Sequence, residues 1–229
     1  MQYLMFVRID PVLATDAVAA VPVGTGGDAP VLAAAVEPAE SAVVVRVRDG
    51  RVERLPAAAP AQREPIAGVE LHEAPDLEAA LEVASRHLAA ATGAIEVREV
   101  LDDFLPPGAA ALPAASASGL DCLLLHRSDR GGAATVPDTA LPEWVRDVEE
   151  RGVTLGGARL RDADAGGAAV VRRRQGEVLI ARGPYAELAE QIGGVDLLRT
   201  ADLDEAVRVA AAHPTALLGA IEIRPLVPR

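Results

Sequence analysis

Two histidines occupy equivalent places in this chain and suggest its simplest chemistry. His87 closes the segment LEVASRH and His213 closes VRVAAAH, so each is expected late in a helix. An imidazole titrates near neutral pH and could act there as a general acid or base. The sequence favours the alternative, a histidine stabilised by the negative end of the helix dipole, because no carboxylate is placed to orient either ring. His72 and His126 lack equivalents and are expected to be incidental.

A second pattern is a repeated Glu-x-Arg triplet at the end of each half of the chain. Its four candidate ligand-binding residues are Glu96, Arg98, Glu222 and Arg224. If these residues face an enclosed interior, the arginines would offer planar donors to a carboxylate or enolate. The sequence favours a salt-bridge lattice between two sheets instead. A repeated arginine stripe at Arg46, Arg48, Arg172 and Arg174 is expected to be a solvated strand face.

These patterns recur because the chain contains an internal duplication. Residues 41–100 align without a gap on residues 167–226 at an offset of 126, with 24 of 60 positions identical. A repeat longer than about 50 residues is a whole domain rather than a solenoid turn. We therefore predict a first repeat over residues 1–103, a Pro/Ala-rich linker over 104–119 and a second repeat over 120–229.

Each repeat is predicted to follow the order β-α-β-β-α-β, with a possible extra short strand. Tight turns are expected at Asp49-Gly50 and Gln175-Gly176. Asp76 and Asp202 are placed to cap the second helix. In the second repeat a first helix is expected over residues 142–151, ending at Gly152, whereas its counterpart between Asp10 and Gly24 is weaker. The predicted apolar stripe of the second helix consists of Leu77, Ala80, Leu81, Ala84 and Leu88.

This order predicts an α+β fold made of two ferredoxin-like units. In the last strand, Ile95 and Val97 should face the helices, which places Glu96 and Arg98 on the uncovered face. Stacking the two uncovered faces within one chain would cover both. We expect a monomer with the architecture of a dimer, although a higher oligomer stays open.

Composition limits the partners. A net charge of −12 and a pI near 4.8 argue against nucleic acid or an anionic membrane as the main partner. The single cysteine, the absence of a signal-like segment and the lack of a long apolar run predict a cytoplasmic protein. Glycine-rich stretches at residues 24–27 and 152–157 lack a phosphate-binding motif, and no metal-ligand spacing occurs. We therefore expect neither a cofactor nor a metal.

Residues 172–226 resemble YCII-related proteins of the DGPF type. The resemblance rests on the segments GPY-x-E, EQIGG, LDEA, HP and IEIRP, which begin at Gly183, Glu190, Leu203, His213 and Ile221. The first repeat is included through the duplication. This family implies a dimeric α+β barrel, here formed within one chain.

The chain departs from the family pattern where the family's chemistry would lie. Arg182 replaces the aspartate of DGPF in the second repeat, and Pro56 replaces it in the first, where three alanines follow. A related branch is thought to use a histidine on the first helix with an aspartate before a proline. The matching positions here are Leu141 and His213.

Three functions therefore stay open. The leading hypothesis is a non-catalytic or degenerate module that binds a small ligand or a partner. The alternative is an acid/base enzyme of the isomerase, lyase or dehalogenase type acting on a small organic acid. His213 would then be the base, Tyr185 and Glu187 would assist it, and Arg224 would anchor the substrate. A third hypothesis, from the same resemblance, is a regulatory partner of a sigma factor.

Overall fold

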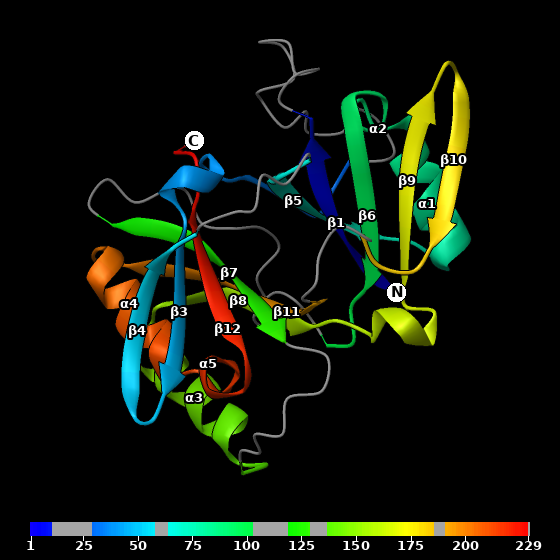
Figure 1. Ribbon diagram of the computed structural model, residues 1–229. Coiled ribbons are helices and arrows are strands. Elements are labelled where there is room, and N and C mark those ends of the chain that lie inside the picture. Colours follow the sequence, from blue (N-terminus) through cyan, green and yellow to red (C-terminus); the bar gives the residue numbers. More distant parts are fainter. Residues whose placement is uncertain (11–28, 58–63, 103–118, 129–136, 186–190, 229) are drawn as a thin grey trace. The chain divides into compact units, whose positions relative to one another are not determined.

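The computed structural model shows an α+β protein made of two compact units, and describes residues 1–10, 29–57, 64–102, 119–128, 137–185 and 191–228 (Figure 1). Unit 1 comprises residues 1–36, 60–103 and 159–188, and unit 2 comprises residues 37–59, 104–158 and 189–229. Each unit contains one six-stranded antiparallel sheet. The α+β class is thus as predicted.

Regular structure alternates between strands and short helices in both halves of the chain. The first half contains β1 (Gln2–Ile9), β2 (Leu32–Ala35), β3 (Val43–Arg48), β4 (Arg51–Pro56), β5 (Ile66–Glu73), α1 (Leu77–Arg86), α2 (Ala89–Thr92) and β6 (Gly93–Glu99). The second half contains β7 (Leu120–Ser128), α3 (Ala140–Glu150), β8 (Thr154–Arg159), β9 (Ala168–Arg174), β10 (Glu177–Arg182), β11 (Gln191–Thr200), α4 (Leu203–Ala212), α5 (Pro214–Leu218) and β12 (Ala220–Pro225). Two 3-10 turns lie at Ala39–Ser41 and Ala163–Ala165.

Each sheet contains a hairpin from the other half of the chain. The strand order is β10-β9-β6-β1-β5-β2 in unit 1 and β4-β3-β12-β7-β11-β8 in unit 2. Strand β9 pairs with β6 through Ile95 and Val171, and β3 pairs with β12 through Val45 and Ile221. Each compact unit therefore contains residues from both predicted repeats. The repeat boundaries at residues 103 and 120 stay a prediction from the sequence.

The two exchanged hairpins turn where the sequence predicts. Asp49 and Gln175 have positive φ angles of 51° and 53°, and the glycine after each also has a positive φ. Two successive residues with positive φ define a turn whose twist matches that of antiparallel strands. The predicted turns at residues 49–50 and 175–176 are confirmed.

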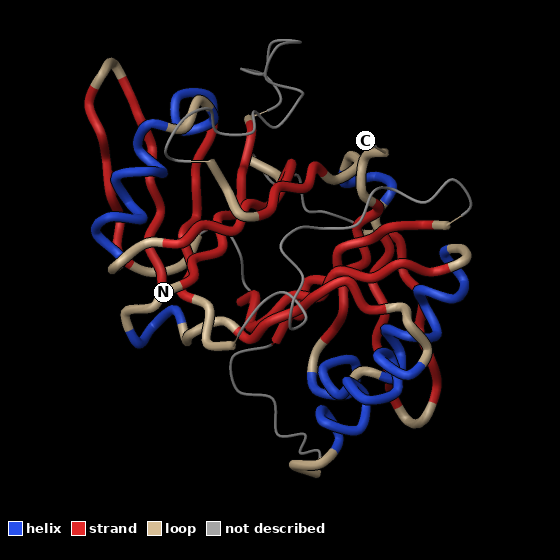
Figure 2. Tube along the Cα trace, turned by 180° about the vertical axis from the view of Figure 1, so that it is seen from behind, coloured by secondary structure: helices blue, strands red, loops and turns tan. Residues whose placement is uncertain are grey.

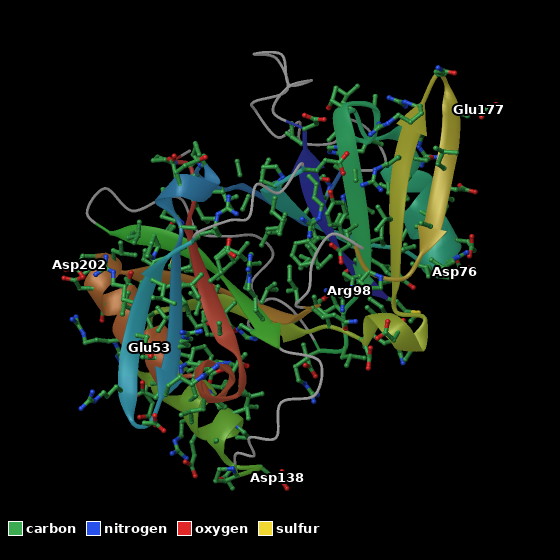
Figure 3. All side chains as sticks on the ribbon, in the orientation of Figure 1. Glu53, Asp76, Arg98, Asp138, Glu177 and Asp202 are labelled. Atoms are coloured by element: carbon green, nitrogen blue, oxygen red, sulfur yellow. The ribbon has the colours of Figure 1, made fainter. Side chains whose placement is uncertain are left out.

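The helix starts also follow the sequence. The Asp76 carboxylate accepts a hydrogen bond from the Ala79 backbone N–H, and Asp202 accepts one from Glu205 (Figure 3). Helix α3 begins at Ala140, two residues before the predicted start, and Gly152 beyond its end has a positive φ of 66°. The proposed first helix of the first repeat and the glycine stretch 24–27 lie outside the described residues.

Each unit buries its core between the sheet and its helices (Figure 2). In unit 1, Ile95 and Val97 pack with Ala80, Leu81 and Ala84 of α1, as predicted, and Ile221 and Ile223 pack against α4 in unit 2. The predicted stripe is wrong at its last residue, because α1 ends at Arg86 and Leu88 beyond it is exposed.

Candidate functional site

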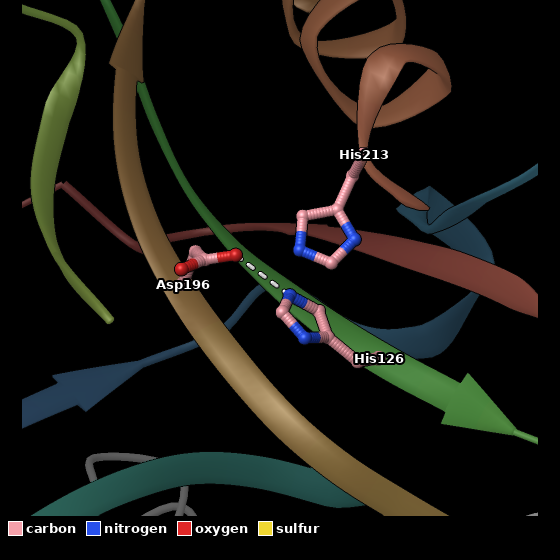
Figure 4. Close-up of side chains that lie close together, drawn as sticks. All are labelled: His126, Asp196 and His213. Carbon is pink, nitrogen blue, oxygen red and sulfur yellow. Dashed lines mark hydrogen bonds and ion pairs between the residues drawn. The ribbon is translucent and has the colours of Figure 1, made fainter. Parts of the chain in front are cut away.

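Three polar side chains in unit 2 meet at the end of α4 (Figure 4). His126 comes from β7, Asp196 from β11, and His213 is the residue that ends α4. His126 Nε2 lies 2.6 Å from Asp196 Oδ2, and the rings of His126 and His213 are 4.3 Å apart. The indole of Trp144 on α3 packs edge-on against His213 at 4.5 Å and donates its N–H to the Val209 carbonyl. The cluster thus joins two strands and two helices.

The hydrogen bonding of His213 fixes its tautomer. Its Nδ1 accepts a hydrogen bond from the Thr215 backbone N–H at 3.0 Å, as the N-cap of α5. The proton of the neutral ring therefore lies on Nε2. That Nε2 is buried and has no hydrogen-bond partner among the described residues. Burial, assisted by the neighbouring His126, lowers the pKa of His213 to about 2, so the ring is neutral at physiological pH.

Glycines make room for the other two side chains. A Cβ at Gly157 on β8 would lie 2.0 Å from Asp196 Oδ1, and one at Gly194 on β11 would lie 2.7 Å from His126 Nδ1. Any larger residue at 157 would therefore displace the carboxylate. The side chains of His126 and Asp196 are each 13% exposed, so the pair is not fully closed off from solvent.

Two histidines and a carboxylate are also a common metal-binding set, and their donor atoms lie within 4.8 Å of one another. The geometry fits a metal poorly. His213 Nε2 carries the proton and offers no lone pair while Thr215 donates to Nδ1. Two ligand atoms on a tetrahedral zinc ion lie about 3.3 Å apart. The contact of 2.6 Å between His126 and Asp196 is a hydrogen bond instead.

Unit 1 contains a related cluster in which the Nε2 atoms of both histidines bind a carboxylate. Glu70 on β5 lies 2.9 Å from His72 Nε2 through one oxygen and 3.4 Å from His87 Nε2 through the other. Burial alone would raise the pKa of Glu70, but the hydrogen bonds from the two histidines outweigh it and the pKa is lowered. The carboxylate is therefore held ionised with both oxygens occupied.

The Glu-x-Arg residues lie on the face of each sheet that points away from the helices, as predicted. In unit 1, Arg8 binds Glu96 at 2.9 Å, and Arg98 lies 3.6 Å from the same carboxylate. In unit 2, Glu222 pairs with Arg127 and, at 3.3 Å, with Arg224. All four predicted ligand-binding residues are buried. They form an internal ion-pair network in each unit, and a salt-bridge lattice between the two sheets stays a prediction.

Tyr185 belongs to unit 1, whereas His213 belongs to unit 2. The Tyr185 hydroxyl donates to Glu64 Oε2 at 2.9 Å, and the Arg8 guanidinium stacks 4.1 Å from its ring centre. Arg172 reaches the same Glu64 oxygen at 2.6 Å. Glu187, the third residue of the predicted catalytic set, lies outside the described residues.

Sequence reasoning missed the carboxylates and half of the histidines. Glu70 and Asp196 are related by the repeat offset of 126, which marks an acidic position kept in both halves. That signal was available. His126 gave none, because its approach to Asp196 depends on the register of β7 against β11 and on the bulge between Ile192 and Gly194. His72 and His126, expected to be incidental, both bind a carboxylate.

The second half of the chain matches a known protein family. Residues 133–229 match the family model of the YCII-related domain, which supports the YCII family for the second half. A search of curated proteins found no match. No described helix is long and apolar enough to cross a membrane.

Proposed function

We propose that this chain is a tandem YCII-related protein of the DGPF type whose repeats form the barrel typical of the family. The internal repeat supports this proposal, as does the one-to-one correspondence of the two strand orders, β10-β9-β6-β1-β5-β2 and β4-β3-β12-β7-β11-β8. We further propose that unit 2 binds a small organic molecule at His126, Asp196 and His213.

One observation carries the binding proposal. The buried Nε2–H of His213 has no acceptor among the described residues. A buried donor left unsatisfied costs about 1–3 kcal/mol, which an oxygen atom of a ligand would recover. The ligand class is therefore a small molecule with a carbonyl or carboxyl oxygen.

The charge of the site adds a condition on the ligand. Asp196 would repel a carboxylate placed beside it, whereas a neutral carbonyl oxygen meets no like charge there. Of the two groups, the carbonyl oxygen is therefore the better fit to the His213 donor.

The binding test is a thermal-shift screen of the full chain with acetate, lactate, pyruvate and succinate. His213→Asn is the informative variant, because asparagine can still accept from Thr215 as an N-cap but lacks the ring donor. We expect it to weaken binding about tenfold, the cost of one hydrogen bond. His87→Asn in unit 1 is the matched control and should leave the response unchanged. A response equal in wild type and His213→Asn would refute the site.

A second function, acid/base catalysis, is favoured by the hydrogen bond of 2.6 Å between His126 and Asp196. A carboxylate that accepts one ring N–H orients an imidazole and stabilises its protonated form. With Nε2–H donated to Asp196, the lone pair of His126 lies on Nδ1. This nitrogen could take a proton from a carbon next to a carbonyl. His126 rather than His213 is then the base.

Proton exchange into pyruvate tests this second function directly. In D2O, abstraction and return of a methyl proton replaces hydrogen with deuterium, which NMR follows without any other product. We expect exchange above the buffer rate in wild type, and its loss in His126→Asn. Binding without exchange would leave the ligand-binding proposal standing and exclude this chemistry for pyruvate.

A further inference from the structure

The histidine clusters of the two units share one design. In each, a carboxylate on the strand before a helix faces the histidine that ends this helix: Glu70 faces His87 after α1, and Asp196 faces His213 after α4. His87 Nδ1 accepts from the Ala89 backbone N–H at 3.1 Å, as His213 Nδ1 does from Thr215 at 3.0 Å. Both rings therefore carry their proton on Nε2 and present a donor to the carboxylate.

The clusters differ in whether this donor is satisfied. In unit 1 one Glu70 oxygen binds His87 and the other binds His72, so both rings have an acceptor. In unit 2 Asp196 Oδ2 binds His126, and His213 Nε2 has no partner among the described residues. Glutamate is longer than aspartate by one methylene, about 1.5 Å of reach. The longer Glu70 side chain reaches the histidine that ends its helix, His87. The shorter Asp196 side chain makes no hydrogen bond to His213.

Exposure separates the two carboxylates and their strand histidines, whereas the helix-end histidines show the reverse order, since His213 is buried and His87 is only partly buried. The Glu70 side chain is fully buried, and those of His72 and His87 are 5% and 8% exposed. His126 and Asp196 are each 13% exposed. Unit 1 thus holds the polar groups of the site without the open acceptor position that a ligand would take.

We infer that the length of one carboxylate decides whether each cluster is open, and that unit 1 contains a second ligand site of the same class, closed by Glu70. The ligand part of this inference rests on the proposed function. Glu70 takes the place of the ligand oxygen at His87. Shortening it opens this site, and lengthening Asp196 closes the other.

The reciprocal variants Glu70→Asp and Asp196→Glu test the inference in the full chain. The first readout needs no ligand, because the Hε2 resonance of a histidine moves downfield when it donates to a carboxylate. We expect the His87 Hε2 to move upfield in Glu70→Asp and the His213 Hε2 to move downfield in Asp196→Glu. Glu73→Asp, at the exposed end of β5, is the matched control and should move neither.

The second readout is a titration with pyruvate. Wild type should respond only at His213, Glu70→Asp at both His87 and His213, and Asp196→Glu at neither. Unmoved Hε2 resonances in both folded variants would overturn the closure, and a shifted His87 that ignores pyruvate would overturn the second site. A lack of response in every protein would overturn the proposed function instead, while the shifts would still decide whether Glu70 closes the cluster.

Discussion

His213 illustrates how burial selects one protonation state of a residue. Its surroundings are apolar on the Trp144 side and include a second imidazole, so a charged ring is disfavoured. The same surroundings leave its Nε2–H without an acceptor among the described residues. A residue that the sequence suggested as a base therefore fits the role of a neutral donor better.

The pKa of His213 predicts a pH-dependent stability. Because burial lowers this pKa to about 2, the unfolded chain binds a proton below its usual pKa of about 6.5 while the folded chain does not. The contribution is fully present above the unfolded pKa and is lost as the pH falls. We expect the free energy of unfolding of His213→Asn to depend less steeply on pH than that of wild type, by roughly 1 kcal/mol per unit between about pH 6 and pH 5. Denaturant titrations at both pH values measure this difference, and parallel slopes would contradict it.

The buried ion pairs predict a second effect at this scale. Glu96→Ala leaves Arg8 and Arg98 without their shared carboxylate inside unit 1 and should destabilise the protein by about 3–5 kcal/mol. Glu53→Ala removes a half-exposed partner of Arg46 and should cost less than about 1 kcal/mol. Chemical denaturation compares the two, and equal losses would show that burial does not set the cost.

Among the elements, the exchanged hairpins are fastened by the arginines that the sequence assigned to a solvated face. Arg48 on β3 donates to the carbonyls of Ala216, Leu217 and Gly219, at the end of α5. Arg174 on β9 does the same at α2, through Ala90, Ala91 and Gly93. The expectation of a purely solvated stripe is wrong for these two, because each satisfies helix carbonyls that have no partner within the helix.

Arg174→Ala should therefore loosen the β9–β10 hairpin from the rest of unit 1. We expect a loss of about 1–3 kcal/mol and faster amide hydrogen exchange in β9, since several carbonyls lose a charged donor. Arg182→Ala, which removes an exposed pair with Glu78, is the control and should leave exchange in β9 unchanged. Exchange that is unaltered in Arg174→Ala would mean that strand pairing alone holds the hairpin.

Local signals predicted the elements well, and contacts between distant elements much less. The Asp caps, the positive-φ turns and the inward faces of β6 and β12 each depend on a few neighbouring residues. The His126 contact and the arginine caps depend on which strands pair and in what register. A hairpin with the same sequence pattern can pair with its own repeat or with the other one, so periodicity cannot decide between them.

At the scale of the molecule, each compact unit is assembled from both halves of the chain. Unit 1 takes its hairpin from residues 168–182, and unit 2 takes its hairpin from residues 43–56. A cut within residues 104–118 should therefore leave the two fragments associated. We expect a chain with a protease site engineered there to elute as one species after cleavage, and to separate only in denaturant. Separation without denaturant would show that the hairpins do not stay exchanged in solution.

The exchanged hairpin also sets an order of events during translation. The ribosome makes β1, β5 and β6 early, but β9 and β10, which complete their sheet, are encoded some 70 to 80 residues after β6. At about 5–20 residues per second, this sheet waits several seconds with β6 as an open edge. Unit 1 therefore cannot complete its sheet until Arg182 has been made, and β6 is the edge that a chaperone would need to protect until then.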